Sequence, residues 1–392
     1  KKYFLAVASF FIYSHISLGQ VYPGQMDSTF VPVRSHHYDP ELTFDFCVNE
    51  PAWSNQAGIH SAFGSTDRLY FRKEVPVNHD NDLSSSYSTT VWRGERANAQ
   101  ILVWSSEALE QVRVSTQDLR SAEGNIIPKD RITFELVRYV LSNYPYAEKK
   151  AICGESPYKS GFLMPDRFET LDRFDLPSQT TRPVWMMVDV PRGTAPGTYK
   201  GQVEVRAKGK APQLLNLEIV VQNQLLPYPK DWKYRLDLWQ NPWAVAWYNH
   251  VEPWSPEHKM LLKQHLKHYA DAGGTYITTY GVHSPWSDNS YMIEGGMIEW
   301  IKKADGTWAF DYKIFDEYVE LAMECGIDEA ITLYTPIPWG FRHRYKDEAT
   351  GDYSYINWAP SSKEFKKMWN IFLTDFKFHL EAKSWLDITY IG

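Results

Sequence analysis

The chain has 392 residues, a formal net charge of −7 and 43% hydrophobic residues, so it is long enough to fill two or three domain cores. Its acidic balance, without a basic cluster, argues against a nucleic-acid partner, whose phosphates require a basic face. Its three cysteines, Cys47, Cys153 and Cys325, are far apart and odd in number, so they predict neither a disulfide framework nor a zinc site, and we expect no metal and no cofactor.

The chain opens with the residue order of a secretory signal peptide. Two lysines precede an apolar run from Tyr3 to Tyr13, and Ser17-Leu18-Gly19 precedes Gln20. We therefore expect residues 1–19 to be a signal peptide and the mature protein to be secreted or periplasmic. The apolar run has about 11 residues against the ~20 that a bilayer requires, so we expect no membrane span.

Aromatic residues are the most informative part of the composition. The chain has 16 Trp, 25 Tyr and 19 Phe, which together make 15% of its residues. The apolar face of a sugar ring stacks on a flat aromatic side chain, so this content favours a carbohydrate partner. Aromatic rings also fill cores, and composition alone leaves both interpretations open.

Short, alternating, β-branched runs extend from Thr89 to Val221. Turn signals such as Glu123–Asn125 and Gly193–Gly197 separate them. Strands of this length and spacing predict an antiparallel β-sandwich, which we place in residues 20–228. The predicted strands are residues 100–105, 112–116, 132–140, 183–190, 197–206 and 214–221.

Prolines in the segment 225–230 stiffen a connector, and beyond it strand patterns alternate with helix patterns. This alternation predicts a parallel sheet with crossover connections. No glycine-rich phosphate loop follows the first strand, which favours a (β/α)8 barrel over an open nucleotide-binding sheet. The predicted strands are residues 235–239, 275–280, 330–334 and 387–391, and the predicted helices are 256–272, 311–325 and 361–383, with Ser255, Asp311 and Ser361 as N-caps.

We expect residues 229–392 to form strands 1 to 4 of this TIM-type barrel. A complete barrel takes ~250 residues, so we also expect the natural protein to continue beyond Gly392. Barrel enzymes place their active sites at the carboxyl ends of the strands, and position along each strand therefore separates site residues from scaffold.

Aromatic and hydrogen-bonding residues follow the predicted strands. Gln240 and Asn241 come after the first strand, His283 and Trp286 after the second, and Trp339 after the third. We predict that these five residues bind substrate, because a sugar subsite needs rings and hydrogen-bonding groups that converge on one rim. For any one of them, packing against neighbouring loop residues is an equally good interpretation.

The carboxylates present do not give a catalytic pair. Asp328 and Glu329 precede the third strand and so face the opposite end of the barrel. Asp237 and Asp387 lie in or at the start of strands, where they read as interior or bottom-face polar groups. Glu294 and Glu299 lie in the insertion after the second strand, where a solvated hairpin is the simpler interpretation. We therefore assign no catalytic residue.

Five segments carry a family resemblance in their order and spacing. They are Trp92–Gln100, Pro191–Gly201, Leu236–Gln240, Phe310–Asp316 and Ile388–Gly392. Together they resemble glycoside hydrolase family 123, the β-N-acetylgalactosaminidases, over most of residues 40–392.

The resemblance implies a β-sandwich before a (β/α)8 barrel and substrate-assisted retention, with an adjacent Asp-Glu pair closing strand four. The aspartate would orient the 2-acetamido group of the sugar, and the glutamate would act as acid and then as base. That pair would begin just beyond Gly392, so we expect this chain by itself to be inactive.

Three functions remain open from the sequence. The first is an exported glycosidase that removes terminal β-linked N-acetylgalactosamine, or N-acetylhexosamine, from glycans or glycolipids. The second is another barrel glycosidase with two ordinary carboxylates. The third is a glycan-binding protein without catalysis.

Overall fold

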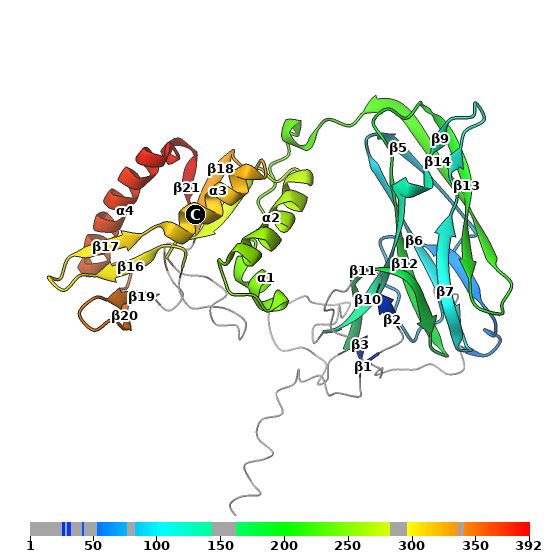
Figure 1. Cartoon of the computed structure of the whole chain (residues 1–392), viewed down its shortest axis with the longest axis horizontal. Helices are drawn as coiled ribbons and strands as arrows, with labels where there is room; N and C mark the ends of the chain where they lie inside the picture. Colours follow the sequence, from blue (N-terminus) through cyan, green and yellow to red (C-terminus); the bar gives the residue numbers. More distant parts are fainter. Residues whose placement is uncertain are drawn as a thin grey trace, which may run out of the picture. The chain divides into compact units, whose positions relative to one another are not determined.

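The computed structural model describes residues 26–27, 30–32, 41–42, 53–76, 83–142, 162–282, 296–334, 337 and 341–392. The predicted signal peptide and the predicted site residues His283, Trp286 and Trp339 lie outside these ranges. The chain divides into two compact units, Lys1–Leu226 and Pro227–Gly392 (Figure 1). No helix among the described residues is long and apolar enough to cross a membrane.

The first unit is a β domain whose strands form a path of pairing in the order β4-β6-β12-β10-β11-β7-β13-β14-β5. Buried side chains from both halves of the path, such as Ile101 and Met186 on one and Val203 and Leu217 on the other, share a single hydrophobic core. The two halves therefore pack face to face as a sandwich. The strands are β4 (His60–Gly64), β5 (Ser86–Arg93), β6 (Arg96–Ser105), β7 (Leu109–Thr116), β10 (Ile132–Ser142), β11 (Phe162–Leu176), β12 (Thr180–Asp189), β13 (Gly197–Arg206) and β14 (Gln213–Leu225), with the short β1 (Met26–Asp27), β2 (Phe30–Pro32), β3 (Glu41–Leu42), β8 (Leu119–Arg120) and β9 (Ile126–Ile127) and the 3-10 turn η3 (Lys129–Arg131).

Strand β11 joins the two halves, and the sequence did not predict it. It pairs with β10 over most of its length and with β7 at Phe174 and Leu176. Its register against β10 shifts next to Pro165, so the proline lies at a bulge where a missing N–H is tolerated. The predicted sandwich was purely antiparallel, and this is wrong at one edge, because β14 and β5 pair in parallel.

The second unit contains a parallel sheet of three strands in the order β15-β18-β21. The predicted first strand, 235–239, appears only as a single parallel bridge between Leu236 and Gly274. Within the described residues these strands do not close into a barrel. The elements are β15 (Tyr276–Tyr280), β18 (Ala330–Tyr334), β21 (Thr389–Ile391), α1 (Pro242–Asn249), α2 (Pro256–Asp271), α3 (Lys313–Glu324), α4 (Lys363–Lys383) and the 3-10 turns η4 (Pro229–Asp231) and η6 (Leu386–Ile388).

Helix boundaries differ from the prediction in small, explicable ways. Ser362, and not Ser361, is the N-cap of α4, because its hydroxyl accepts the N–H of Phe365 at 3.1 Å. Asp311 accepts the N–H of Lys313 at 2.9 Å, although it precedes the N-cap of α3. Asp387 lies in η6, ahead of the strand that was predicted to begin there.

A second, four-stranded sheet in this unit was not predicted as such. Its order is β17-β16-β19-β20, and it comes from hairpins inserted after β15 and β18. One face packs on α4 through an aromatic cluster in which Trp300 contacts Phe310, Trp369 and Phe372. Much of the aromatic content therefore fills a core. The strands are β16 (Glu299–Lys302), β17 (Trp308–Asp311), β19 (Arg342–Asp347) and β20 (Tyr353–Asn357).

Backbone contact without intervening side chains joins this inserted sheet to the end of β15. Ile298 donates its N–H to the carbonyl of Gly281 at 2.9 Å. A Cβ atom on Gly296 would lie 2.4 Å from that same carbonyl oxygen and 2.7 Å from the carbonyl carbon of Val282. Only glycine fits at 296, because the atoms it meets are backbone and cannot turn away.

Replacing Gly296 by alanine should therefore destabilise the second unit by about 1–3 kcal/mol, as overpacking against fixed atoms does. Thermal and denaturant unfolding followed by circular dichroism measure this loss. Gly193→Ala is the control, because no atom lies within 4 Å of its added Cβ. Equal stability of the two variants would contradict the close approach.

Candidate functional site

An aromatic pair, one exposed and one half-buried, lies at the carboxyl end of the parallel sheet. Tyr280 and Tyr334 are the last residues of β15 and β18 and are paired in register, so their side chains share a face. The ring of Trp239, from the preceding segment, lies with its centroid 4.3 Å from that of Tyr334. Trp239 is 51% exposed although it is among the largest apolar side chains in the unit. We call Trp239 and Tyr334 the aromatic platform.

Two buried tyrosine hydroxyls hold the segment that carries Trp239. The Tyr269 hydroxyl lies 2.6 Å from the carbonyl oxygen of Leu236 and accepts the N–H of Leu238 at 3.3 Å. The Tyr280 hydroxyl donates to the carbonyl of Gln240. Burial raises the pKa of the Tyr269 hydroxyl, which therefore stays protonated. The segment is fixed at its carbonyl groups on both sides of Trp239.

The predicted ligands Gln240 and Asn241 lie next to the platform in sequence, and both are half-buried. The Asn241 side-chain oxygen accepts the N–H of Ala244 at 3.0 Å, so it is the N-cap of α1. Asn241 thus has a structural role as the N-cap of α1. The structure brings these two residues together, while His283, Trp286 and Trp339 lie outside the described residues.

His258, in α2, bonds to the first residue of α1. Its side chain is fully buried, with Nδ1 accepting the N–H of Trp254 at 2.8 Å and Nε2 lying 2.8 Å from the carbonyl oxygen of Pro242. These partners require a neutral ring with the proton on Nε2. Burial lowers the pKa of His258, which agrees with that neutral form.

The described carboxylates of this unit are placed away from a catalytic pair. Glu329 accepts the hydroxyl of Thr275 at 2.8 Å at the amino end of the sheet, opposite the platform. Asp237 accepts the hydroxyl of Thr278 at 2.8 Å, midway along the strands. Neither Glu329 nor Asp237 is therefore placed as an acid at the carboxyl ends of the strands.

A small polar cavity, unforeseen in the sequence, lies just beyond β15. Its volume is about 30 Å³, and it is lined by Val282, Gly296, Ile298, Glu299, Trp300, Arg344, Tyr345 and Tyr353. Tyr353 donates its hydroxyl to Glu299, which raises the pKa of that tyrosine. The cavity has room for one or two small polar groups and not for a sugar ring.

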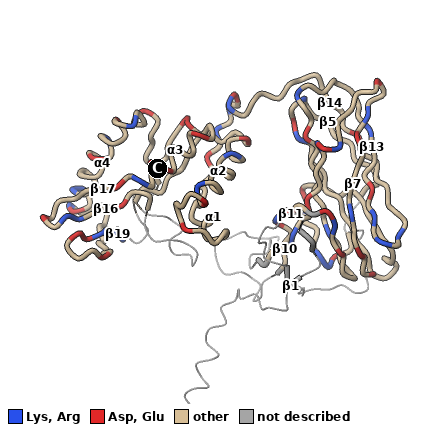
Figure 2. The backbone as a smooth tube through the Cα atoms, in the orientation of Figure 1, with Lys and Arg blue, Asp and Glu red and all other residues tan. Residues whose placement is uncertain are grey.

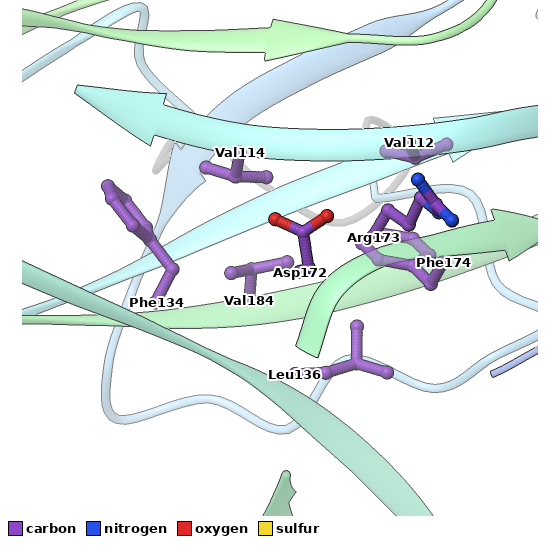
Figure 3. A pocket seen from close by; sticks show the side chains of 8 residues that line it. All are labelled: Val112, Val114, Phe134, Leu136, Asp172, Arg173, Phe174 and Val184. Carbon is purple, nitrogen blue, oxygen red and sulfur yellow. The ribbon is translucent and has the colours of Figure 1, made fainter. Parts of the chain in front are cut away.

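A cavity in the first unit is too small to hold a glycan. It has a volume of about 20 Å³, which suffices for a single water. Figure 3 shows Val112 and Val114 on one side and Leu136 on the other, with Asp172 among them. Asp172 is engaged in an ion pair with Arg113. The cavity is therefore a packing gap within the sandwich.

Electrostatics of the described residues give no sign of a metal centre or a broad charged surface. No group of three or more His, Cys, Asp or Glu side chains in the described part of the chain could hold a metal ion. Lys and Arg alternate with Asp and Glu along both units (Figure 2).

Trp239 and Tyr334 are the site residues that sequence reasoning missed. Both were assigned to predicted strands, where an aromatic residue is expected to be buried. The available signal was position, because each is the last apolar residue before a loop at the carboxyl end of a strand.

Comparisons with known proteins give one consistent family. Residues 239–392 match the model of the glycoside hydrolase 123 catalytic domain, and residues 63–207 match that of the glycoside hydrolase 123 N-terminal domain. No curated protein matches the chain.

One solved structure is similar over most of the chain. It is described as a family 123 glycoside hydrolase from Clostridium perfringens, studied for glycolipid glycan hydrolysis, with 27% identity and a TM-score of 0.76. The match covers 86% of this chain and 58% of that one. A PapD-like domain of human CEP192, at 14% identity and a TM-score of 0.21, covers 36% of this chain and 82% of its own. That second likeness is too slight to carry an argument.

The His258 geometry predicts a pH dependence of stability. Its folded pKa lies below the ordinary value of 6.5, so the unfolded chain binds the proton more readily. The stability of the second unit should be complete above about pH 6.5 and fall as the pH drops through the lowered pKa. Denaturant unfolding between pH 5 and 8 measures this loss.

His258→Gln is the comparison that isolates this group, because His265 also has a lowered pKa. The glutamine amide can still donate to Pro242 but leaves the Trp254 N–H without its acceptor, at a cost of about 1–3 kcal/mol at pH 7. The variant should lose less stability than the native protein between pH 7 and pH 5. Parallel pH profiles would contradict the assigned tautomer.

Proposed function

Because the chain belongs to glycoside hydrolase family 123, we propose that it is part of an exported glycosidase that removes terminal β-linked N-acetylgalactosamine, or N-acetylhexosamine, from glycans or glycolipids. One observation carries the proposal. The exposed ring of Trp239 lies against the half-buried ring of Tyr334 at the carboxyl end of the parallel sheet, within the segment that matches the catalytic domain. A sugar ring stacks on such a surface.

The proposed reaction is substrate-assisted retention. The carbonyl oxygen of the 2-acetamido group attacks the anomeric carbon while an acid protonates the leaving oxygen, and water then opens the cyclic intermediate with that acid acting as base. A second carboxylate orients the acetamido group. We assign neither role to a described residue of this chain.

The platform would contribute binding and orientation. A sugar ring held against Trp239 adopts fewer orientations. A larger fraction of these orientations presents the anomeric carbon to the attacking acetamido oxygen. The tyrosine hydroxyls that fix residues 236–240 keep the tryptophan in place before the sugar arrives. Such preorganisation lowers the ordering cost of binding.

Two further parts of the proposal concern architecture and location. The parallel strands β15, β18 and β21 would belong to a (β/α)8 barrel, since this succession and the position of the site at the strand ends are typical of that fold. Export to the periplasm or the medium is proposed from the residue order at 1–19.

Hydrolysis of a chromogenic β-N-acetylgalactosaminide tests the activity. Hydrolysis should be measured for this chain and for the longest form that its gene encodes. Each protein should also be assayed with the matching β-glucoside as a second substrate. Release of the chromophore from the acetamido sugar alone supports the proposal. Sugar binding without turnover by the longest form would favour a non-catalytic glycan-binding protein, and hydrolysis of both substrates would favour a glycosidase with two ordinary carboxylates.

Trp239→Ala should weaken binding of N-acetylgalactosamine to this chain by about tenfold, because one stacked ring contributes roughly 0.5–1.5 kcal/mol beyond the area it buries. Titration monitored by nuclear magnetic resonance measures the dissociation constant. Trp92→Ala, which removes a 40% exposed tryptophan from the first unit, should leave it unchanged. Similar affinity for both variants would remove the platform from the site.

Glu329→Gln should leave sugar binding unchanged, because that carboxylate lies at the amino end of the sheet with Thr275. The same titration checks this. If the variant loses sugar binding while keeping the stability of the native chain, the site lies at the amino end of the strands and the proposal is wrong.

A further inference from the structure

One face of the β domain points away from its hydrophobic core. Met186 and Leu136 belong to that core, so their neighbours along β12 and β10 lie on the opposite face of the sheet. The pairing registers of β6, β12, β10 and β11 extend this face across four strands. We call six of its residues the outer face: Asn98, Thr133, Val137, Phe168, Trp185 and Met187.

Two aromatic rings of the outer face meet across β10. Trp185 comes from β12 and Phe168 from β11, on either side of β10, and their ring centroids lie 5.5 Å apart. Val137, the register partner of Phe168 on β10, is only 5% exposed although it lies on this face. The rings therefore form an apolar strip over β10. Phe168 remains 44% exposed, so the strip is open to a ligand.

Hydrogen-bonding groups lie in the row beside this strip. Asn98, Met187 and Thr133 are register partners across three strands. The side-chain oxygen of Asn98 accepts the indole N–H of Trp185 at 3.2 Å, which fixes that ring at its edge. Neither the Asn98 side-chain nitrogen nor the Thr133 hydroxyl has a hydrogen-bond partner among the residues that the structure describes. Both groups are therefore available next to the rings.

The charged groups around the outer face already have partners. Arg96 and Asp189 face each other in the following row and form two hydrogen bonds, of 2.6 and 3.3 Å. Glu135, beside Trp185 in the register, accepts the hydroxyl of Thr170 at 3.1 Å. A neutral ligand leaves these pairs intact, whereas an ionic ligand would compete with them.

The apolar strip is small. A buried aromatic side chain covers about 150–250 Å², and Phe168 exposes less than half of its surface while Trp185 is half-buried. A stable protein interface takes about 800 Å² from each partner. The strip is far smaller than that, and it suits a ligand of the size of a sugar ring. A pyranose has an apolar face that stacks on aromatic rings and hydroxyls at its rim that need polar partners.

We propose that the outer face is a second carbohydrate site, which binds a neutral pyranose unit of a glycan on the β domain without catalysing its cleavage. The sugar stacks on Phe168 and Trp185, and its hydroxyls bond with the Asn98 amide and the Thr133 hydroxyl. This site lies in the first unit, is separate from the aromatic platform and does not depend on the proposed reaction.

Calorimetric titration of the 392-residue chain with a neutral disaccharide, N-acetylgalactosamine β-linked to galactose, tests the proposal. The chain carries Trp239→Ala, so that the platform contributes little. It should still bind the disaccharide, at one site per chain. Adding Phe168→Ala should weaken this binding about tenfold, because a stacked ring is lost. Phe168→Tyr should preserve it, because the ring remains.

Thr133→Val removes one hydroxyl with little change of shape and should weaken the same binding about threefold to tenfold. Trp92→Ala is the matched control, because it removes a 40% exposed aromatic residue from β5, at the other end of the strand path. It should leave the binding unchanged. Circular dichroism of each variant during thermal unfolding separates a loss of binding from a loss of the fold.

The outcomes separate this inference from the proposed function. Disaccharide binding that needs Trp239 and is unchanged by Phe168→Ala overturns this inference alone. Binding that needs Phe168 and not Trp239 supports it and removes the platform from the proposed function. If Phe168→Ala lowers stability without changing binding, the rings serve only to cover Val137 and the inference is wrong. Self-association that needs Phe168, seen by analytical ultracentrifugation without sugar binding, would make the outer face a contact between copies and would also overturn it.

Discussion

The candidate site depends on how residues 236–240 are held without a strand ladder. This segment makes one bridge to Gly274, and it is further anchored by the hydroxyls of Tyr269 and Tyr280 on α2 and β15 and by the Thr278 hydroxyl, which donates to Asp237. Both rings are buried in the core of the second unit. Since a buried hydroxyl must find a partner, the core itself fixes the carbonyls on either side of Trp239. An exposed tryptophan is thereby supported by a rigid base.

The same core also places the inserted sheet. Trp300 and its aromatic neighbours pack one face of that sheet on α4, while the contact between Gly296 and Gly281 fixes its edge at the end of β15. The other face is left with its arginines and tyrosines outward. A single apolar cluster therefore supports both the aromatic platform and the inserted sheet.

Sequence patterns predicted the elements whose burial follows a simple period. Strand β18 has the predicted bounds 330–334, and α2 begins after the predicted cap Ser255, because each has one buried face and clear end signals. Strand β11 was missed because Pro165 and the many charged residues of the strand conceal its alternating pattern. The bulge against β10 is what allows a proline within this strand. Trp239 looked like a strand residue, and its exposure results from tertiary contacts of Tyr269 and Tyr280 that local pattern does not encode. The family resemblance came from spaced segments and is confirmed by both domain matches.

The central claim is that an N-acetylhexosamine ring occupies the carboxyl end of the parallel sheet. A crystal structure of the chain soaked with N-acetylgalactosamine tests it most directly. The account predicts the sugar ring stacked on Trp239, near Tyr334 and Gln240, with its acetamido group directed toward the strand ends. A sugar bound at the amino end beside Glu329, or only on the β domain, would contradict it.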